Sequence, residues 1–174
     1  FNYEDCPGHP TWMEPTEWLG AKNNADPLHL ISNQPKTKLH SQMDNGTLSS
    51  SIKIKGHQPL EMNPDDAQSR GITQGDIVRV FNGRGSCLCG VNITADVMPG
   101  VVIISTGSWY DPAEPNDPKS MCKHGNPNVL SPDIGTSKLG QGPAAHSCLA
   151  EIEKYDGPVH NITAFNPPEI IEKK

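Results

Sequence analysis

The sequence predicts a single mostly β domain, a barrel with short helices and long ordered loops, and three observations support this. Only 34% of the 174 residues are hydrophobic, and 17 prolines and 16 glycines divide the chain into short segments, which favours strands and loops over long helices. Residues 63–85 contain helix, strand and hairpin signals in succession. Residues 101–104 are a β-branched run of the kind that is buried on both faces of a strand.

A short helix is predicted to begin at Asn63. Asn63 suits the N-cap and Pro64 the first helical position, while Asp65 and Asp66 place negative charge beside the unpaired amides of the first turn. Gly71 is expected to end the helix in a left-handed conformation, which costs glycine little.

A hairpin is predicted next. Gly75-Asp76 turns the chain into the alternating strand 77–81, and Asn82-Gly83 signals the hairpin because both residues tolerate positive φ. The second strand is expected over residues 86–94. Asp66 and Arg84 are expected to stabilise the cap and the turn.

The other elements are shorter. We expect strands at 28–31, 52–54, 60–62, 101–104 and about 146–153, a flexible surface connection at 43–51, and a long ordered loop at 107–147. Residues 1–26 are predicted to form an extended arm from a preceding domain, residues 27–168 the barrel, and residues 169–174 a frayed tail.

The sequence lacks the features that are typical of several classes of protein. The net charge is −6 and no run of Lys or Arg exceeds two residues, which argues against a nucleic-acid surface, and no apolar stretch approaches the ~20 residues that span a bilayer. Nucleophile–base patterns, the P-loop and the Rossmann glycines are absent as well.

The five cysteines are odd in number and scattered. Cys87 and Cys89 should share one face of a strand but do not have zinc-site spacing, nor do Cys122 and His124, so we expect no metal ligand.

Polar side chains on glycine-rich loops remain, and they suit a large ligand with amides, rings and phosphates. His40, Ser41 and Gln42 stand out as candidates, although the residues alone favour an ordinary loop histidine at His40. Trp109 and Tyr110 either stack on a ligand or pack within the fold. Asp111 and Asp133 are expected in Asx-turns.

Four ordered motifs, at 30–42, 63–85, 107–112 and 125–142, resemble the C-terminal molybdopterin-dinucleotide-binding domain of the DMSO reductase family. The similarity is closest to the trimethylamine N-oxide, DMSO and biotin sulfoxide reductases. It implies a double-psi β-barrel that forms the last domain of a larger polypeptide and binds bis-molybdopterin guanine dinucleotide with molybdenum. It further implies two-electron reduction of an S-oxide or N-oxide by the whole enzyme.

The resemblance also implies which residues approach the cofactor. The residues expected at one dinucleotide are Ser32, Asn33, Gln34, Lys36, His40, Ser41 and Gln42, and those expected at pterin or pyrophosphate are Asn128, Gly140 and Gln141. The family's molybdenum-ligating serine lies in an earlier domain, so this domain alone should be inactive and hold no catalytic residue. Lys38 replaces a common arginine and Ser131 a frequent threonine.

The partners implied by the resemblance are the upstream domains, a small S-oxide or N-oxide substrate and an electron-donor cytochrome, with no nucleic acid and no membrane insertion. A periplasmic location is favoured over a cytoplasmic one, and molybdenum over tungsten. The alternative is a freestanding double-psi barrel that acts as a recognition module without catalysis.

Overall fold

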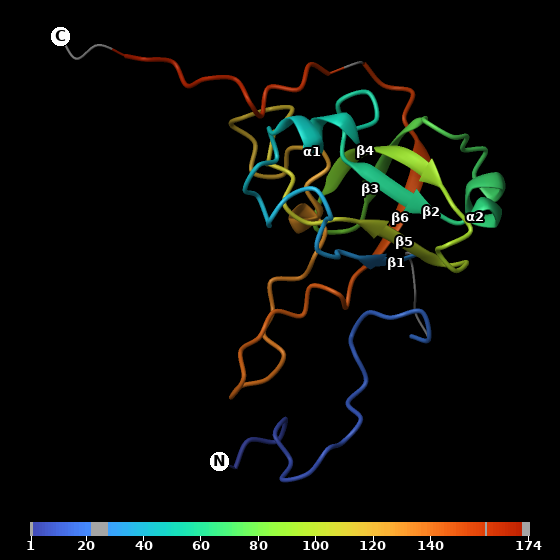
Figure 1. Ribbon diagram of the computed structural model, residues 1–174. Coiled ribbons are helices and arrows are strands. Elements are labelled where there is room, and N and C mark those ends of the chain that lie inside the picture. Colours follow the sequence, from blue (N-terminus) through green and yellow to red (C-terminus); the bar gives the residue numbers. More distant parts are fainter. Residues whose placement is uncertain (1, 22–27, 159, 172–174) are drawn as a thin grey trace.

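Six strands close into a barrel in the computed structural model, which describes residues 2–21, 28–158 and 160–171 (Figure 1). The strands are β1 (Leu28–Ile31), β2 (Pro59–Met62), β3 (Ile77–Phe81), β4 (Ser86–Ile93), β5 (Val101–Ile104) and β6 (Leu149–Lys154). Their order around the barrel is β1-β5-β2-β4-β3-β6.

The barrel contains both parallel and antiparallel strand pairs. β1 pairs with β5 and β2 with β4 in parallel, whereas the remaining neighbours are antiparallel. Because a closed barrel has no edge strand, short strands such as these can still satisfy their backbone groups. The mostly β, double-psi barrel prediction is confirmed.

The helices are few and short: α1 (Thr47–Ser51), α2 (Pro64–Ser69) and a 3₁₀ turn, η1 (Pro127–Val129). The capped helix is confirmed at α2. Asn63 Oδ1 accepts from the Asp65 amide at 2.9 Å, and Gly71 has φ +63°. Asp66 Oδ2 also accepts from the Gly100 amide at 2.7 Å and so ties α2 to the turn before β5, a structural role as expected.

The β3–β4 hairpin is confirmed, but its turn differs from the prediction. Phe81 pairs with Ser86, so the loop has four residues, and neither Asn82 nor Gly83 has positive φ. Asn82 acts through its side chain instead. Its Oδ1 accepts from the Arg84 amide and its Nδ2 donates to the carbonyls of Leu130 and Leu149. Arg84 is structural as predicted, since its Nε donates to the Leu130 carbonyl at 2.6 Å.

Two local predictions were wrong. The expected flexible connection at 43–51 contains α1, where the buried Ser49 hydroxyl donates to the Thr37 carbonyl at 3.0 Å. Residues 52–54 form no strand, only the single bridge between Ile54 and His57. β6 begins at Leu149 and ends at Lys154, slightly later than predicted.

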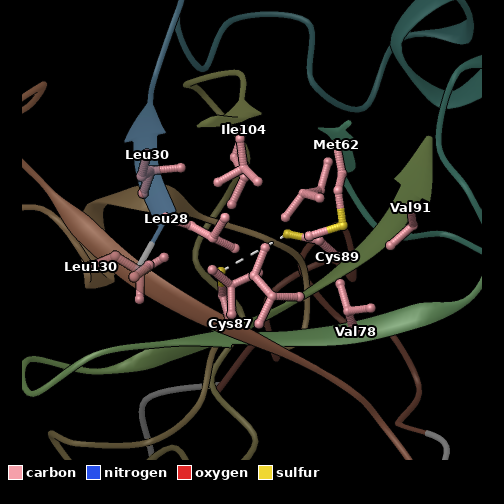
Figure 2. Packing of buried hydrophobic residues seen from close by; sticks show 14 of the residues in the cluster. Leu28, Leu30, Met62, Val78, Cys87, Cys89, Val91, Ile104 and Leu130 are labelled. Carbon is pink, nitrogen blue, oxygen red and sulfur yellow. Dashed lines mark hydrogen bonds between the residues drawn. The ribbon is translucent and has the colours of Figure 1, made fainter. Parts of the chain in front are cut away.

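The core fills the barrel interior with aliphatic and sulfur-containing side chains (Figure 2). Cys87 and Cys89 lie on one face of β4 as expected, with their Sγ atoms 4.0 Å apart, and no cysteine forms a disulfide among the described residues. Leu130 enters the core from the end of η1. In β5 three of four residues are buried, while Ile103 is half-buried and faces the groove described next.

Candidate functional site

A groove of about 560 Å³ lies on the outside of the barrel wall. It crosses the half-buried, outward positions of three neighbouring strands: Ile103 of β5, Glu61 of β2 and Asn92 of β4. Residues 33–37, which follow β1, line one end, and Ile52 and Ile54 line a side. The groove therefore exists because a polar loop folds back over strands whose other faces form the core.

Two carboxamides in the groove have polar partners, and the orientation of one of them is fixed. Asn33 Oδ1 accepts from the Ser105 hydroxyl at 2.7 Å. Gln58 Oε1 accepts from Lys38 Nζ at 3.0 Å and from the Ser108 hydroxyl at 2.7 Å. Since an ammonium group only donates, Gln58 must place its oxygen toward Lys38. The Gln58 amino group is then the end left for a ligand, which favours acceptors such as phosphate or carbonyl oxygens.

A buried ion cluster lies behind this end of the groove. Lys38 Nζ and Lys53 Nζ contact the same Asp44 oxygen at 2.6 and 2.9 Å, and all three side chains are almost fully buried. Burial alone would raise the pKa of Asp44, but hydrogen bonds from Lys38, the Trp109 amide and Lys53 outweigh it and hold that pKa below its usual value. Two ammonium groups against one carboxylate leave a net positive charge, which also favours an anionic ligand.

The loop that carries His40, Ser41 and Gln42 is strained and braced. His40 and Met43 have φ values of +50° and +65°, and Leu39 pairs with Gln42 to close the turn. Lys38 and Asp44 join the two ends of this turn through their ion pair. Backbone strain of this kind persists only where the surroundings impose it, and it is found mainly at functional sites.

The segment after β5 holds the loop 39–43 in place; its contacts with this loop are called the brace. Trp109 Nε1 donates to the Ser41 carbonyl at 2.7 Å, and the Trp109 amide donates to Asp44 Oδ2 at 3.0 Å. Its ring packs edge-on against Phe165 with centroids 5.2 Å apart. Of the two interpretations of Trp109, packing within the fold agrees with these contacts. Gly107 lies directly beneath the loop, where a Cβ would come within 1.7 Å of the His40 carbonyl oxygen.

The side chains at the tip of this loop contribute nothing visible to the fold. Within the part of the chain that the structure describes, the side chains of His40, Ser41 and Gln42 make no hydrogen bond, and all three residues are exposed. Only backbone groups of Ser41 and Gln42 are bonded. A rigid loop that presents unpaired polar groups is suited to binding.

Asp111 was predicted wrongly as an Asx-turn residue. It is buried and accepts from the Thr163 amide and hydroxyl, both at 2.6 Å, and from Lys123 Nζ at 3.2 Å. It thereby joins Thr163 to the turn that contains Lys123. Proline neighbours are compatible with an Asx-turn, but only the tertiary fold brings Thr163 to this carboxylate.

The predicted ligand residues occupy separate places. Asn33, Gln34 and Lys36 line the groove, and Ser32 lies at the end of β1, where its hydroxyl donates to the Ile104 carbonyl at 3.3 Å. Asn128 is in η1, and its amide donates to Asn126 Oδ1. Gly140 and Gln141 belong to the loop after residue 130, which projects away from the barrel (Figure 1). Gln141 has φ +50° and its Nε2 donates to the Ser137 carbonyl at 2.9 Å.

Sequence reasoning missed Gln58, Asp44 and Lys53, which shape the groove from behind. No local pattern identifies them, because their partners are 6 to 65 residues away in sequence. Among the described residues, no three His, Cys, Asp or Glu side chains are grouped to hold a metal ion. In the same residues, no helix has the length and apolar character that would let it cross a membrane.

Comparison with known proteins agrees with this architecture. Residues 28–149 match the family model described as the molydopterin dinucleotide binding domain. The chain is 49% identical over 170 residues, 98% of its length, to the dimethyl sulfoxide/trimethylamine N-oxide reductase of Rhodobacter capsulatus. It is 50% identical over 95% of its length to the trimethylamine-N-oxide reductase of Salmonella typhimurium, and 49% identical over 89% to the biotin sulfoxide reductase of Cereibacter sphaeroides.

The chain spans only about a fifth of each of these relatives, namely 21, 20 and 20%. Among solved structures, acetylene hydratase from Pelobacter acetylenicus superposes with a TM-score of 0.67 over 84% of this chain and 21% of that one. At 18% identity, this likeness shows the fold alone. The family match over most of the chain shows that it belongs to the molydopterin dinucleotide binding domain family.

Proposed function

We propose that this domain binds bis-molybdopterin guanine dinucleotide within a larger molybdenum oxidoreductase that reduces S-oxides or N-oxides. The support is the family membership together with reductases of such oxides among the relatives at 47–50% identity. The structural observation that carries the proposal is the braced loop 39–43, which presents His40, Ser41 and Gln42 without an internal partner.

The residues present fit an acceptor-rich, anionic ligand. Gln58 has an amide donor left over, Lys36 lies in the groove, and the Lys38–Asp44–Lys53 cluster has a net positive charge. We assign the groove and the loop 39–43 to one dinucleotide, which Ser32, Asn33, Gln34, Lys36, His40, Ser41 and Gln42 would hold.

A second contact region is assigned to the projecting loop and η1. Asn128, Gly140 and Gln141 would reach pterin or pyrophosphate from there. The metal and its dithiolene sulfurs supply the redox chemistry when the cofactor is bound, while the domain positions the cofactor and adjusts its electrostatic surroundings. The isolated domain is accordingly expected to turn over no substrate.

The other parts of the proposal concern the whole protein. Its partners are the upstream domains of the same polypeptide, an S-oxide or N-oxide substrate and an electron-donor cytochrome, and its location is the periplasm. The arm at residues 1–26 and the tail at 169–174 are proposed to flank the barrel at 27–168. A freestanding recognition barrel is not favoured, because the matching family is defined by dinucleotide binding.

Release of GMP by acid hydrolysis tests the proposal. The full-length protein that contains this sequence, purified from molybdate-supplied cells, should release about two GMP per polypeptide, the expectation for a bis-dinucleotide cofactor. A protein that is folded and releases no GMP would exclude the proposed cofactor. Release of GMP without reduction of trimethylamine N-oxide, dimethyl sulfoxide or biotin sulfoxide would preserve the binding role and exclude the substrate class.

A further inference from the structure

A second cavity, of about 250 Å³, lies on the other side of the turn between α1 and β2. It is bounded by this turn, by the start of β3, by the middle of β4 and by the end of β6. Gly157, Pro158 and His160, which follow β6, complete the lining. Along the turn, Ile54 and Gln58 face the groove, whereas Lys55 and His57 face the second cavity. The two spaces share no lining residue, so a ligand in one does not require a ligand in the other.

Nitrogen bases dominate the polar lining of this cavity. Lys55, His57, Lys154 and His160 contribute to it, against the single carboxylate of Asp76. That carboxylate is already engaged, because its Oδ2 accepts from Lys154 Nζ at 3.0 Å and from the amide and hydroxyl of Thr73. Among the described residues Lys55 has no acidic partner. The cavity therefore has an uncompensated positive charge even with both histidines neutral.

The His57 ring is held so that one nitrogen remains for a ligand. His57 is buried, and its Nδ1 lies 2.6 Å from the Lys123 carbonyl oxygen, so Nδ1 must carry the proton. Nε2 is the ring nitrogen left over. Burial and then the neighbouring charges of His160, Lys53 and Lys55 lower the pKa of His57. An anion in the cavity would offset those charges and favour a protonated, donating Nε2.

Lys55 occupies a backbone position that does not suit lysine. Ile54 and His57 exchange two backbone hydrogen bonds of 3.0 Å around Lys55 and Gly56, whose φ values are +51° and +85°. Such a two-residue turn favours Asn, Asp or Gly at its first position. A strained residue is a reason to look for a function of its side chain, and this side chain borders the cavity.

The remaining walls are apolar. Ile77, Leu88 and Pro158 contribute side chains, and the Tyr155 hydroxyl is engaged by His160 Nε2 at 3.0 Å. The cavity thus combines cationic groups with an apolar surface. We propose that it binds a small organic anion, whose phosphate or carboxylate group is held by Lys55, His57 and Lys154 and whose body lies against Ile77 and Leu88.

Titration calorimetry on the full-length protein tests this site, with phenyl phosphate and benzoate as the organic anions and phenol as the uncharged analogue. Either anion, or both, should bind with one site per chain, and phenol should bind at least about tenfold more weakly, because a hydrogen bond to a charged group typically accounts for such a factor. Comparison of the two anions distinguishes phosphate from carboxylate recognition.

Lys55→Gly is the decisive variant. Glycine suits the positive φ, so the turn and the barrel should remain folded while affinity for the anion falls at least about tenfold. Lys119→Gly, which removes an exposed lysine from a distant loop, should leave the affinity unchanged. Absence of anion binding, equal binding of phenol, or unchanged affinity in Lys55→Gly would each overturn the proposal, whether or not the protein contains GMP.

Discussion

Trp109 connects the loop 39–43, the ion cluster and His124 through three different groups. Its indole donates to the Ser41 carbonyl, its amide donates to Asp44, and its carbonyl accepts from His124 Nδ1 at 3.0 Å. The ring also packs on Phe165. Only the indole hydrogen bond reaches the exposed loop directly, so a substitution can remove it and leave the other contacts in place.

Trp109→Phe should loosen the loop without unfolding the barrel. Phenylalanine keeps the amide, the carbonyl and most of the ring packing but loses the donor to Ser41. A hydrogen bond of this kind contributes about 1 kcal/mol, so dinucleotide retention should fall about three- to tenfold. GMP per chain after extensive gel filtration measures the retention, and the melting temperature of the apoprotein measures the fold.

Tyr155→Phe is the matched control, because it also removes one polar hydrogen from an aromatic residue but at the second cavity. It should leave GMP retention unchanged. If Trp109→Phe keeps full GMP content, the brace has no role in binding. If Trp109→Phe loses GMP and also clearly lowers the melting temperature of the apoprotein, the indole hydrogen bond has a structural role.

The β3–β4 hairpin shows how an element can be predicted correctly for the wrong local reason. Asn82-Gly83 between two β-forming runs indicated the hairpin, and the hairpin is present. Nevertheless, the turn requires no positive φ at either residue. The Asn82 amide instead joins the hairpin to the Leu130 and Leu149 carbonyls, 48 and 67 residues away in sequence.

Asn82→Ala should therefore destabilise the hairpin, whereas Gly83→Ala should not. The first substitution removes the Asn82 donor from the Leu149 carbonyl and from the Leu130 carbonyl, which keeps its bond from Arg84, and the loss costs about 1–3 kcal/mol. The second adds a Cβ with nothing within 4 Å and at a φ that alanine tolerates, so the change should stay within about 0.5 kcal/mol. Amide hydrogen exchange of β3 and β4 reports both effects. If Gly83→Ala destabilised the hairpin more than Asn82→Ala, Gly83 would supply a backbone conformation that alanine cannot adopt.

Across the whole molecule, buried polar groups make stability depend on pH. His124 is fully buried at the junction of the ion cluster, Trp109 and Phe165. Burial, followed by the charge of Lys53, lowers the pKa of His124 from 6.5 to about 4. Between these values the unfolded chain binds a proton that the folded chain does not, so stability is complete above pH 6.5 and is lost as the pH falls toward 4.

Because of His124, the free energy of unfolding should be about 3 kcal/mol lower at pH 4 than above pH 6.5. His57 should lower it further, because its pKa is also below the usual value. Unfolding by urea between pH 7.5 and 4 measures it. His124→Gln should flatten the profile in this window, because the amide can still donate to the Trp109 carbonyl and does not titrate. Asp44 and Asp111 have lowered pKa values, so their contributions begin to fall only below about pH 5 and are lost mainly below pH 4. An unchanged slope in His124→Gln would show that His124 is not the responsible group.

The sequence by itself determined the strands at 28–31, 60–62, 77–81 and 101–104 and helix α2, because these depend on residues that are neighbours along the chain. The barrel was predicted from composition, from these strands and from the resemblance of four motifs to a known family. Short-range signals such as the Asn63 cap act within a few residues. Predictions from local patterns were wrong for helix α1 and for Asp111, because contacts with residues distant in sequence decide the structure there. The tertiary structure alone decided the groove, the Lys38–Asp44–Lys53 cluster and the brace at Trp109. These arise where barrel closure brings together segments that are distant in sequence, and the resulting burial forces polar groups to find partners that no local pattern specifies.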